Sequence, residues 1–193
     1  MSVPEPRSPL SVASLSVSGA AAHPMIAEMP SAIVDLAAQR GRAGDLAVAV
    51  RAAFGIDLPG PGHFAAGAAV TAVWIKPETW LLLAPRGEEG ALARSVATAV
   101  GNAGSVVDQS HGKTRFRLAG AHARAVLAKG CRVDLHPSVF GPGRSAATQM
   151  AQVGTVLLQR DDGPGFELVV GASYAVPFLE WLADAAAEFA GTR

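Results

Sequence analysis

The order of its strand and helix patterns most constrains what this chain can fold into. From residue 31 onward, the apolar patterns predict a strand and a helix, then a two-stranded hairpin, then a second helix and strand. The predicted strands cover 31–37, 69–75, 80–85 and 105–110, and the predicted helices cover 44–55 and 88–101. A β-α-β-β-α-β order is the split βαβ arrangement of a ferredoxin-like unit. We therefore predict an α+β half over residues 31–110, with helices packed on an antiparallel sheet.

A related pattern begins again at residue 111. The predicted elements are a strand over 113–120, a helix over 121–130, and strands over 145–150, 153–160 and 166–171. In the first of these strands, Phe116 alternates with Arg115 and Arg117, which predicts one face toward solvent. The second pattern therefore repeats the α+β character of the first.

The last predicted helix is the clearest element of the chain. Apolar side chains from Tyr174 to Phe189 recur along one continuous stripe, as they do on a helix with one buried face. Together the two patterns predict a single domain over residues 31–193, made of two ferredoxin-like pseudo-repeat halves, 31–110 and 111–193.

The stretch before this domain has a different composition. Residues 1–30 are rich in Ser, Pro and Ala, which predicts a flexible arm. Within it, 10–22 alternates serines with apolar residues and lacks the continuous apolar core of a signal peptide. No stretch approaches the roughly 18 uninterrupted apolar residues of a transmembrane helix. We therefore expect a cytoplasmic protein that does not enter a membrane.

The charge balance excludes some classes of partner. The chain has 16 basic and 16 acidic residues, a formal net charge of zero and a pI of about 7.0, so we expect no broad cationic face for nucleic acid or anionic lipid. Charged residues make up 17% of the chain, against about 25% in typical domains. A charge-poor surface favours burial against another protein chain.

The run from Ala128 to Gly143 concentrates the residue types that could carry chemistry. Cys131 follows Gly130, a typical helix-ending glycine, and we expect a lone cysteine there to be a small buried hydrophobe rather than a nucleophile. Asp134 and His136 could offer two metal ligands on one face of an extended segment, but no third ligand is evident. We predict neither a metal site nor a catalytic residue in this run.

The glycine-rich loop FGPGRS superficially resembles a phosphate-binding loop. It lacks the G-x-x-x-x-G-K-[ST] pattern, and no strong strand leads into it, so a turn between helix and strand explains it better. The sequence also has no G-x-G-x-x-G and no G-x-S-x-G motif. Flavin-fingerprint and hydrolase hypotheses therefore find no support, and we predict that the chain binds no cofactor itself.

The region from residue 108 to residue 127 resembles a known family. The matching residues are Asp108, Ser110, His111, Gly112, Lys113, Gly120, Ala123 and Leu127. They are similar to a run in the glycine-cleavage T-protein superfamily, the folate-dependent aminomethyltransferases and their relatives. Within it, the chain most resembles the gamma subunits of heterotetrameric sarcosine oxidases. That resemblance covers about residues 26–190 and includes AFGIDLPGPG, WIKPETWLLL, LAKGCRVDLHPSVFGPG and SYAVPFLEWL.

The resemblance implies a domain of the folate-binding T-protein type that lacks the family's chemistry. The aminomethyltransferases carry acidic residues in a turn that leads into a strand. The corresponding stretch here is 154–158, with leucines in place of the acids. A carboxylate can accept a proton or stabilise a developing cation, and an alkyl group cannot. The resemblance therefore implies a non-catalytic subunit.

The resemblance also implies partners and cofactors. The expected complex contains alpha, beta and delta subunits and oxidatively demethylates sarcosine to glycine, giving hydrogen peroxide and formaldehyde or methylenetetrahydrofolate. FAD, FMN, NAD, zinc and tetrahydrofolate are expected on the partner subunits. Among exposed residues of the 136–144 loop, we expect His136, Phe140 and Arg144 to contact partners. Two alternatives stay open: a stand-alone folate-binding protein and a ferredoxin-like small-molecule regulatory module.

Overall fold

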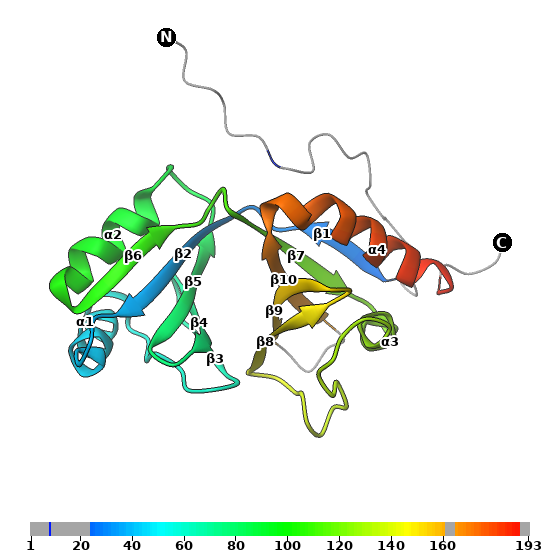
Figure 1. The fold of residues 1–193 in the computed structure, drawn as a ribbon, viewed down its shortest axis with the longest axis horizontal. Coiled ribbons are helices and arrows are strands. Elements are labelled where there is room, and N and C mark those ends of the chain that lie inside the picture. Colours follow the sequence, from blue (N-terminus) through cyan, green and yellow to red (C-terminus); the bar gives the residue numbers. More distant parts are fainter. Residues whose placement is uncertain (1–7, 9–23, 161–164, 190–193) are drawn as a thin grey trace, which may run out of the picture.

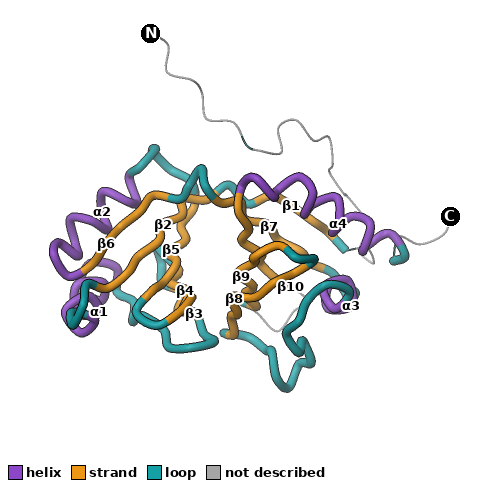
Figure 2. Tube along the Cα trace, viewed as in Figure 1, coloured by secondary structure: helices purple, strands orange, loops and turns teal. Residues whose placement is uncertain are grey.

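The computed structural model, which describes residue 8 and residues 24–160 and 165–189, places two antiparallel β-sheets side by side (Figure 1). Helices lie on the outer faces of both sheets, as the purple segments of Figure 2 show. The inner faces of the sheets meet in an apolar cluster of their own. The molecule is therefore layered as helices, sheet, sheet and helices.

The first sheet comes from the predicted first half. Its strands, in spatial order, are β3 (Phe64–Ala66), β4 (Thr71–Lys76), β5 (Thr79–Pro85), β2 (Ser31–Ala38) and β6 (Gly104–Asp108). Helices α1 (Ala43–Phe54) and α2 (Ala91–Val100) cover its outer face, where Leu46 and Val96 pack with Val34. A short 3₁₀ turn, η2 (Gly101–Ala103), leads into β6. Apart from the three-residue edge strand β3, this is the predicted order, and the ferredoxin-like fold class is confirmed.

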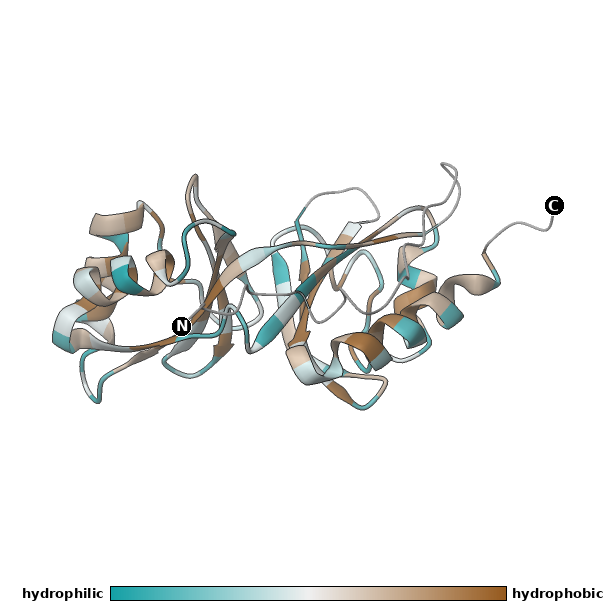
Figure 3. Cartoon of the chain, turned by 90° about the horizontal axis from the view of Figure 1, so that it is seen from above, coloured by the Kyte–Doolittle hydropathy of each residue, from teal (hydrophilic) through white to brown (hydrophobic). Residues whose placement is uncertain are grey.

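The second sheet contains strands from both ends of the chain. In spatial order they are β1 (Met25–Glu28), β7 (Lys113–Ala119), β10 (Gly165–Gly171), β9 (Val153–Gln159) and β8 (Arg144–Met150). The outer face carries α3 (Ala123–Ala128) and, after the 3₁₀ turn η3 (Ala172–Tyr174), α4 (Ala175–Ala187). Figure 3 shows hydrophobic and hydrophilic residues alternating along α4. The apolar stripe faces the sheet, with Phe178 lying 6.0 Å from Phe116 between ring centroids.

Strand β1 corrects the predicted organisation of the N-terminal region. The sequence predicts a flexible arm over 1–30, but residues 25–28 pair antiparallel with β7. The two sheets have the same strand order when β1 is matched with β6, so the second half is closed by a strand that precedes it in the chain. The domain therefore begins before residue 31. The rest of the predicted arm, apart from Ser8 and residues 24 and 29–30, lies outside the described residues.

Local chemistry explains where the first elements end. Helix α1 ends at Gly55, whose φ of 66° is left-handed and whose N–H donates to the carbonyl oxygen of Arg51 at 2.9 Å. The predicted turn KPET connects β4 to β5 through Pro77 and Glu78.

Among the described helices, none is long and apolar enough to cross a membrane.

Ile26 offers a test of the placement of β1. Its side chain is 6% exposed and belongs to the core beneath α3 and α4, whereas the neighbouring Met25 is 47% exposed. We expect Ile26→Ala to lower the free energy of unfolding by about 2 kcal/mol, because it removes buried methyl and methylene groups. Met25→Ala is expected to change it by less than about 0.5 kcal/mol. Chemical denaturation of both variants measures the difference, and equal effects would contradict the pairing.

Candidate functional site

One arginine holds the run from Ala128 to Gly143 against the second half. Arg124 of α3 donates through Nη1 to the carbonyl oxygens of Leu135 and Phe140, the latter at 3.1 Å. Its Nη2 donates to Oε1 of Gln159 at 2.9 Å. Leu135 and Phe140 are themselves buried. The run is therefore a packed structural turn, pinned from α3.

The structure separates the three predicted partner contacts. His136 is exposed on the turn. Phe140 is 3% exposed and stacks at 6.5 Å from the ring of Phe166, so the expectation that it is exposed is wrong. Arg144 is half-buried, and its Nη1 lies 2.9 Å from Nε2 of His63 in the first half. His136 is thus accessible to a partner, while Arg144 also joins the two halves of the chain.

The potentially reactive residues of this run have structural partners. The Asp134 carboxylate accepts the backbone N–H of His136 at 2.8 Å, and Nδ1 of His136 lies 2.7 Å from Oγ of Ser138. Cys131 packs half-buried against the core, and burial raises the pKa of its thiol, which disfavours the nucleophilic thiolate. Across the part of the chain that the structure describes, no three His, Cys, Asp or Glu side chains gather as a metal site requires.

An ion cluster joins the inner faces of the two sheets. Glu167 of β10 is 3% exposed and accepts hydrogen bonds from Nη2 of Arg115 at 2.6 Å and from Nε of Arg160 at 2.5 Å. The two arginines also reach the first sheet. Arg115 donates to Oγ of Ser31 at 3.2 Å, and Arg160 donates to Oγ1 of Thr71 at 2.9 Å. Both carboxylate oxygens of Glu167 are therefore occupied in holding the halves together.

This cluster corrects the predicted solvent-facing side of β7. The strand alternates as expected, but the face with Arg115 points at the other sheet, and Arg115 is 6% exposed. Sequence reasoning missed the cluster, although one signal was present. Glu167 is the one charged residue in the apolar run FELVVG, and a lone acid in a buried strand requires a partner of opposite charge.

The space between the sheets does not suit a folate site with an unpaired catalytic carboxylate. Side chains from both sheets, such as Ile33, Leu81 and the fully buried Leu158, fill its centre. A cavity of about 290 Å³ remains beside them, at the lower end of the roughly 300–1,000 Å³ of ligand pockets. Asp35, which sequence reasoning missed, lines this cavity with its Oδ2 3.5 Å from Nζ of Lys113. The carboxylate that lines this cavity is thus paired with a lysine.

The sequence of most of the domain matches a known protein family. The model of the sarcosine oxidase gamma subunit family matches residues 40–188. This chain belongs to that family. It is 38% identical over 159 residues to the sarcosine oxidase subunit gamma of Arthrobacter sp., covering 81% of this chain and 76% of the relative. It is 37% identical over 161 residues to the gamma subunit of Corynebacterium sp. U-96, covering 82% and 76%.

Solved structures give the same assignment at the level of the fold. A chain of the heterotetrameric sarcosine oxidase from Corynebacterium sp. U-96, in complex with pyrrole 2-carboxylate, matches with a TM-score of 0.81 and 28% identity, covering 97% of this chain and 98% of that one. The glycine cleavage system aminomethyltransferase T from Bartonella henselae matches with a TM-score of 0.63 and 15% identity, covering 84% and 46%. The second match shows the fold alone. The T-protein-like fold and the gamma-subunit family, both predicted from the sequence, are confirmed.

Proposed function

We propose that this chain is the non-catalytic gamma subunit of a sarcosine oxidase complex with alpha, beta and delta partners. In the complex, sarcosine is oxidatively demethylated to glycine while dioxygen is reduced to hydrogen peroxide. The methyl carbon leaves as formaldehyde or as methylenetetrahydrofolate. The partner subunits hold FAD, FMN, NAD, zinc and tetrahydrofolate, and this chain contributes structure rather than chemistry.

The proposal that this chain is non-catalytic rests on the carboxylates between the sheets, which are paired with cationic side chains. A general base must be free to take a proton from the substrate. Both oxygens of Glu167 are bound by arginines, Asp35 faces Lys113, and Leu158 fills the centre. These side chains connect the two sheets and leave the inner faces without a free proton acceptor among the described residues.

The exposed turn after Leu135 supports a contact with a partner subunit. His136 is exposed there, and Val139 is 49% exposed, although it is a large apolar side chain. His136 and Arg144 stay predictions as partner contacts, whereas the burial of Phe140 opposes such a role for its ring. The cytoplasmic location expected from the sequence also stays a prediction.

Co-expression with the alpha, beta and delta subunits tests the proposal. We expect the tagged chain to purify with these subunits in a fixed ratio, and the complex to produce hydrogen peroxide when sarcosine is added. Omitting the chain is expected to reduce the yield of assembled complex, because the partner surface that this chain covers is then left open to solvent. A chain that purifies alone as a stable monomer, and never with these subunits, would contradict the assignment.

A carboxylate variant separates structural from catalytic roles within the complex. Asp35→Asn removes the accessible carboxylate of the inner cavity, and we expect sarcosine turnover to stay within about twofold of the parent. Replacing a catalytic base would instead lower the turnover of sarcosine about a hundredfold or more.

Calorimetric titration of the chain alone with tetrahydrofolate is expected to show no binding heat. Saturable binding would favour a stand-alone folate-binding protein.

A further inference from the structure

The two sheets, as far as the structure describes them, have four edge strands, and three of these are protected. An edge strand presents unpaired backbone N–H and C=O groups to any extended chain that approaches it. Strand β3 has three residues, and β1 has four residues between Pro24 and Pro30. Strand β8 is bonded at both ends, where the N–H groups of Ser145 and Ala151 donate to carbonyl oxygens outside the sheet at 3.0 and 3.1 Å. Each of these edges is therefore short or partly occupied.

Strand β6 is the edge that lacks such protection among the described residues. Figure 1 shows it as the outermost strand of the first sheet, next to β2. Its five residues, GSVVD, contain no proline and no lysine, and they pair with β2 in continuous register without a bulge. Proline, lysine and bulges are the usual devices that keep another strand from pairing with an edge. The edge of β6 is therefore open to a further strand.

The hydrogen bonds at the two ends of β6 fix which backbone groups point away from β2. At one end, the N–H of Gln109 donates to β2 at 2.8 Å. At the other end, the carbonyl oxygen of Ala103 accepts the N–H of the residue that follows β2, at 2.9 Å. Alternate residues of an antiparallel strand bond to the same neighbour, so Gly104, Val106 and Asp108 direct their N–H and C=O groups outward. Within the described residues, these outward groups have no hydrogen-bond partner.

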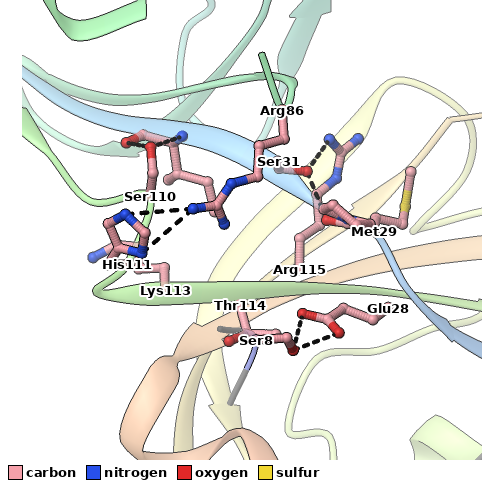
Figure 4. Close-up of a pocket in the computed structure, with 12 residues that line it drawn as sticks. Ser8, Glu28, Met29, Ser31, Arg86, Ser110, His111, Lys113, Thr114 and Arg115 are labelled. Carbon is pink, nitrogen blue, oxygen red and sulfur yellow. Dashed lines mark hydrogen bonds between the residues drawn. The ribbon is translucent and has the colours of Figure 1, made fainter. Parts of the chain in front are cut away.

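The turn after β6 holds this edge in place. The Asp108 carboxylate accepts the backbone N–H of Ser110 at 2.9 Å, and Oγ of Ser110 accepts the N–H of Ile33 in β2 at 3.0 Å. Figure 4 shows Ser110 beside His111, whose ring nitrogens lie 3.4 Å from Nη2 of Arg86. An edge that is already ordered loses little conformational entropy when another strand pairs with it.

The side chains of β6 indicate which chemistry fits beside them. Val107 is 50% exposed, on the face of the sheet that carries its cross-strand partner Asp35. An apolar side chain next to Val107 would cover it. Asp108 forms no ion pair within the described residues, so a basic side chain fits at that end of the strand.

We infer that β6 pairs with an extended segment of a partner subunit, with an apolar residue beside Val107 and a basic residue beside Asp108. The outward N–H and C=O groups would then bond to the backbone of that segment, which extends the first sheet by one strand. The inference rests on the proposed function, because it requires the partner subunits. The neighbours of this chain in the proposed complex are other subunits, so the segment belongs to one of them rather than to a second copy.

Hydrogen–deuterium exchange, resolved by residue in the isolated chain and in the co-expressed complex, tests this inference. We expect the amides of Gly104, Val106 and Asp108 to exchange at least about a hundredfold more slowly in the complex, because each then donates to the partner strand. The amide of Ala147, which points outward from β8 two residues after Ser145, is the internal control and is expected to keep its rate.

The outcomes of this experiment separate the inference from the proposed function. An assembled complex with an unchanged rate at Val106 would overturn the inference and leave the proposed function standing. A chain that never assembles with the other subunits would overturn both. Slow exchange at Val106 in the isolated chain, increasing with protein concentration, would show that second copies pair through β6 and would overturn the assignment to a partner subunit.

Val107→Lys and Val48→Lys form the matched pair of variants. Val48 lies on α1 and is 70% exposed, so both changes place a lysine at an exposed valine. Val107→Lys is expected to lower the yield of assembled complex at least about tenfold, because it buries a charge against the partner strand. Val48→Lys is expected to leave that yield unchanged, and both isolated variants to unfold at the parent's urea midpoint. Equal yields from the two variants would overturn the inference. If Val107→Lys does not fold, the Val106 exchange rate in the parent complex decides the matter.

Discussion

Replacing Glu167 with glutamine is expected to lower the free energy of unfolding by about 3–5 kcal/mol, because it leaves a buried cation without its counter-charge. Glu167 is 3% exposed and binds Arg115, which is itself 6% exposed. Glutamine has nearly the same shape, so the variant removes charge with little change in packing. Arg160, which is 28% exposed, can regain some hydration, but Arg115 cannot. Urea denaturation of the purified chain measures the loss.

An exposed acid and a double variant provide the controls for this expectation. Glu180 lies on the exposed side of α4, so Glu180→Gln is expected to change the free energy of unfolding by less than about 0.5 kcal/mol. Replacing Arg115 and Glu167 together with leucine removes both buried charges, and we expect it to cost less than the sum of the two single changes. If Glu167→Gln were as mild as Glu180→Gln, the cluster would contribute nothing to holding the two sheets together.

The parts of the fold that the sequence predicts are those with long, periodic patterns. The hairpin of β4 and β5 and the stripe of α4 lie where their periodicity places them, because each buries its own apolar face over at least six residues. The order of elements from β7 to α4 repeats the order from β2 to α2. The family signature at residues 128–143 also has the structural role expected of it.

The remaining features depend on partners that are distant in sequence. Met25–Glu28 is four residues long between prolines, and nothing local shows that it pairs with β7 about ninety positions later. The alternation of Arg115 in β7 has the same period whether its polar face meets water or a second sheet. Whether this face meets water or the other sheet depends on the partner of Arg115. That partner is Glu167, which is 52 residues away in the sequence. Likewise, nothing in the loop after Gly130 shows that Phe140 turns inward.

Phe140 supplies the second large expected effect, because its burial distinguishes a core residue from a partner contact. Phe140→Ala is expected to lower the free energy of unfolding of the isolated chain by about 3–5 kcal/mol, the usual cost of truncating a buried aromatic side chain. Its ring is 3% exposed and stacks on Phe166. The neighbouring Val139 is 49% exposed, and Val139→Ala is expected to cost less than about 0.5 kcal/mol. Denaturation curves of the two variants give the comparison.

His136→Ala completes the test by separating stability from assembly. His136 is exposed, and its ring contacts Ser138 within the turn, so we expect this variant to keep the parent's free energy of unfolding within about 0.5 kcal/mol. If the turn is a partner contact, His136→Ala is expected to weaken co-purification with the other subunits, whereas Phe140→Ala weakens the chain before any partner is added. A Phe140→Ala chain with the parent's stability but impaired assembly would reverse both assignments. It would show that the ring leaves the core to meet a partner, which its burial and its stacking on Phe166 oppose.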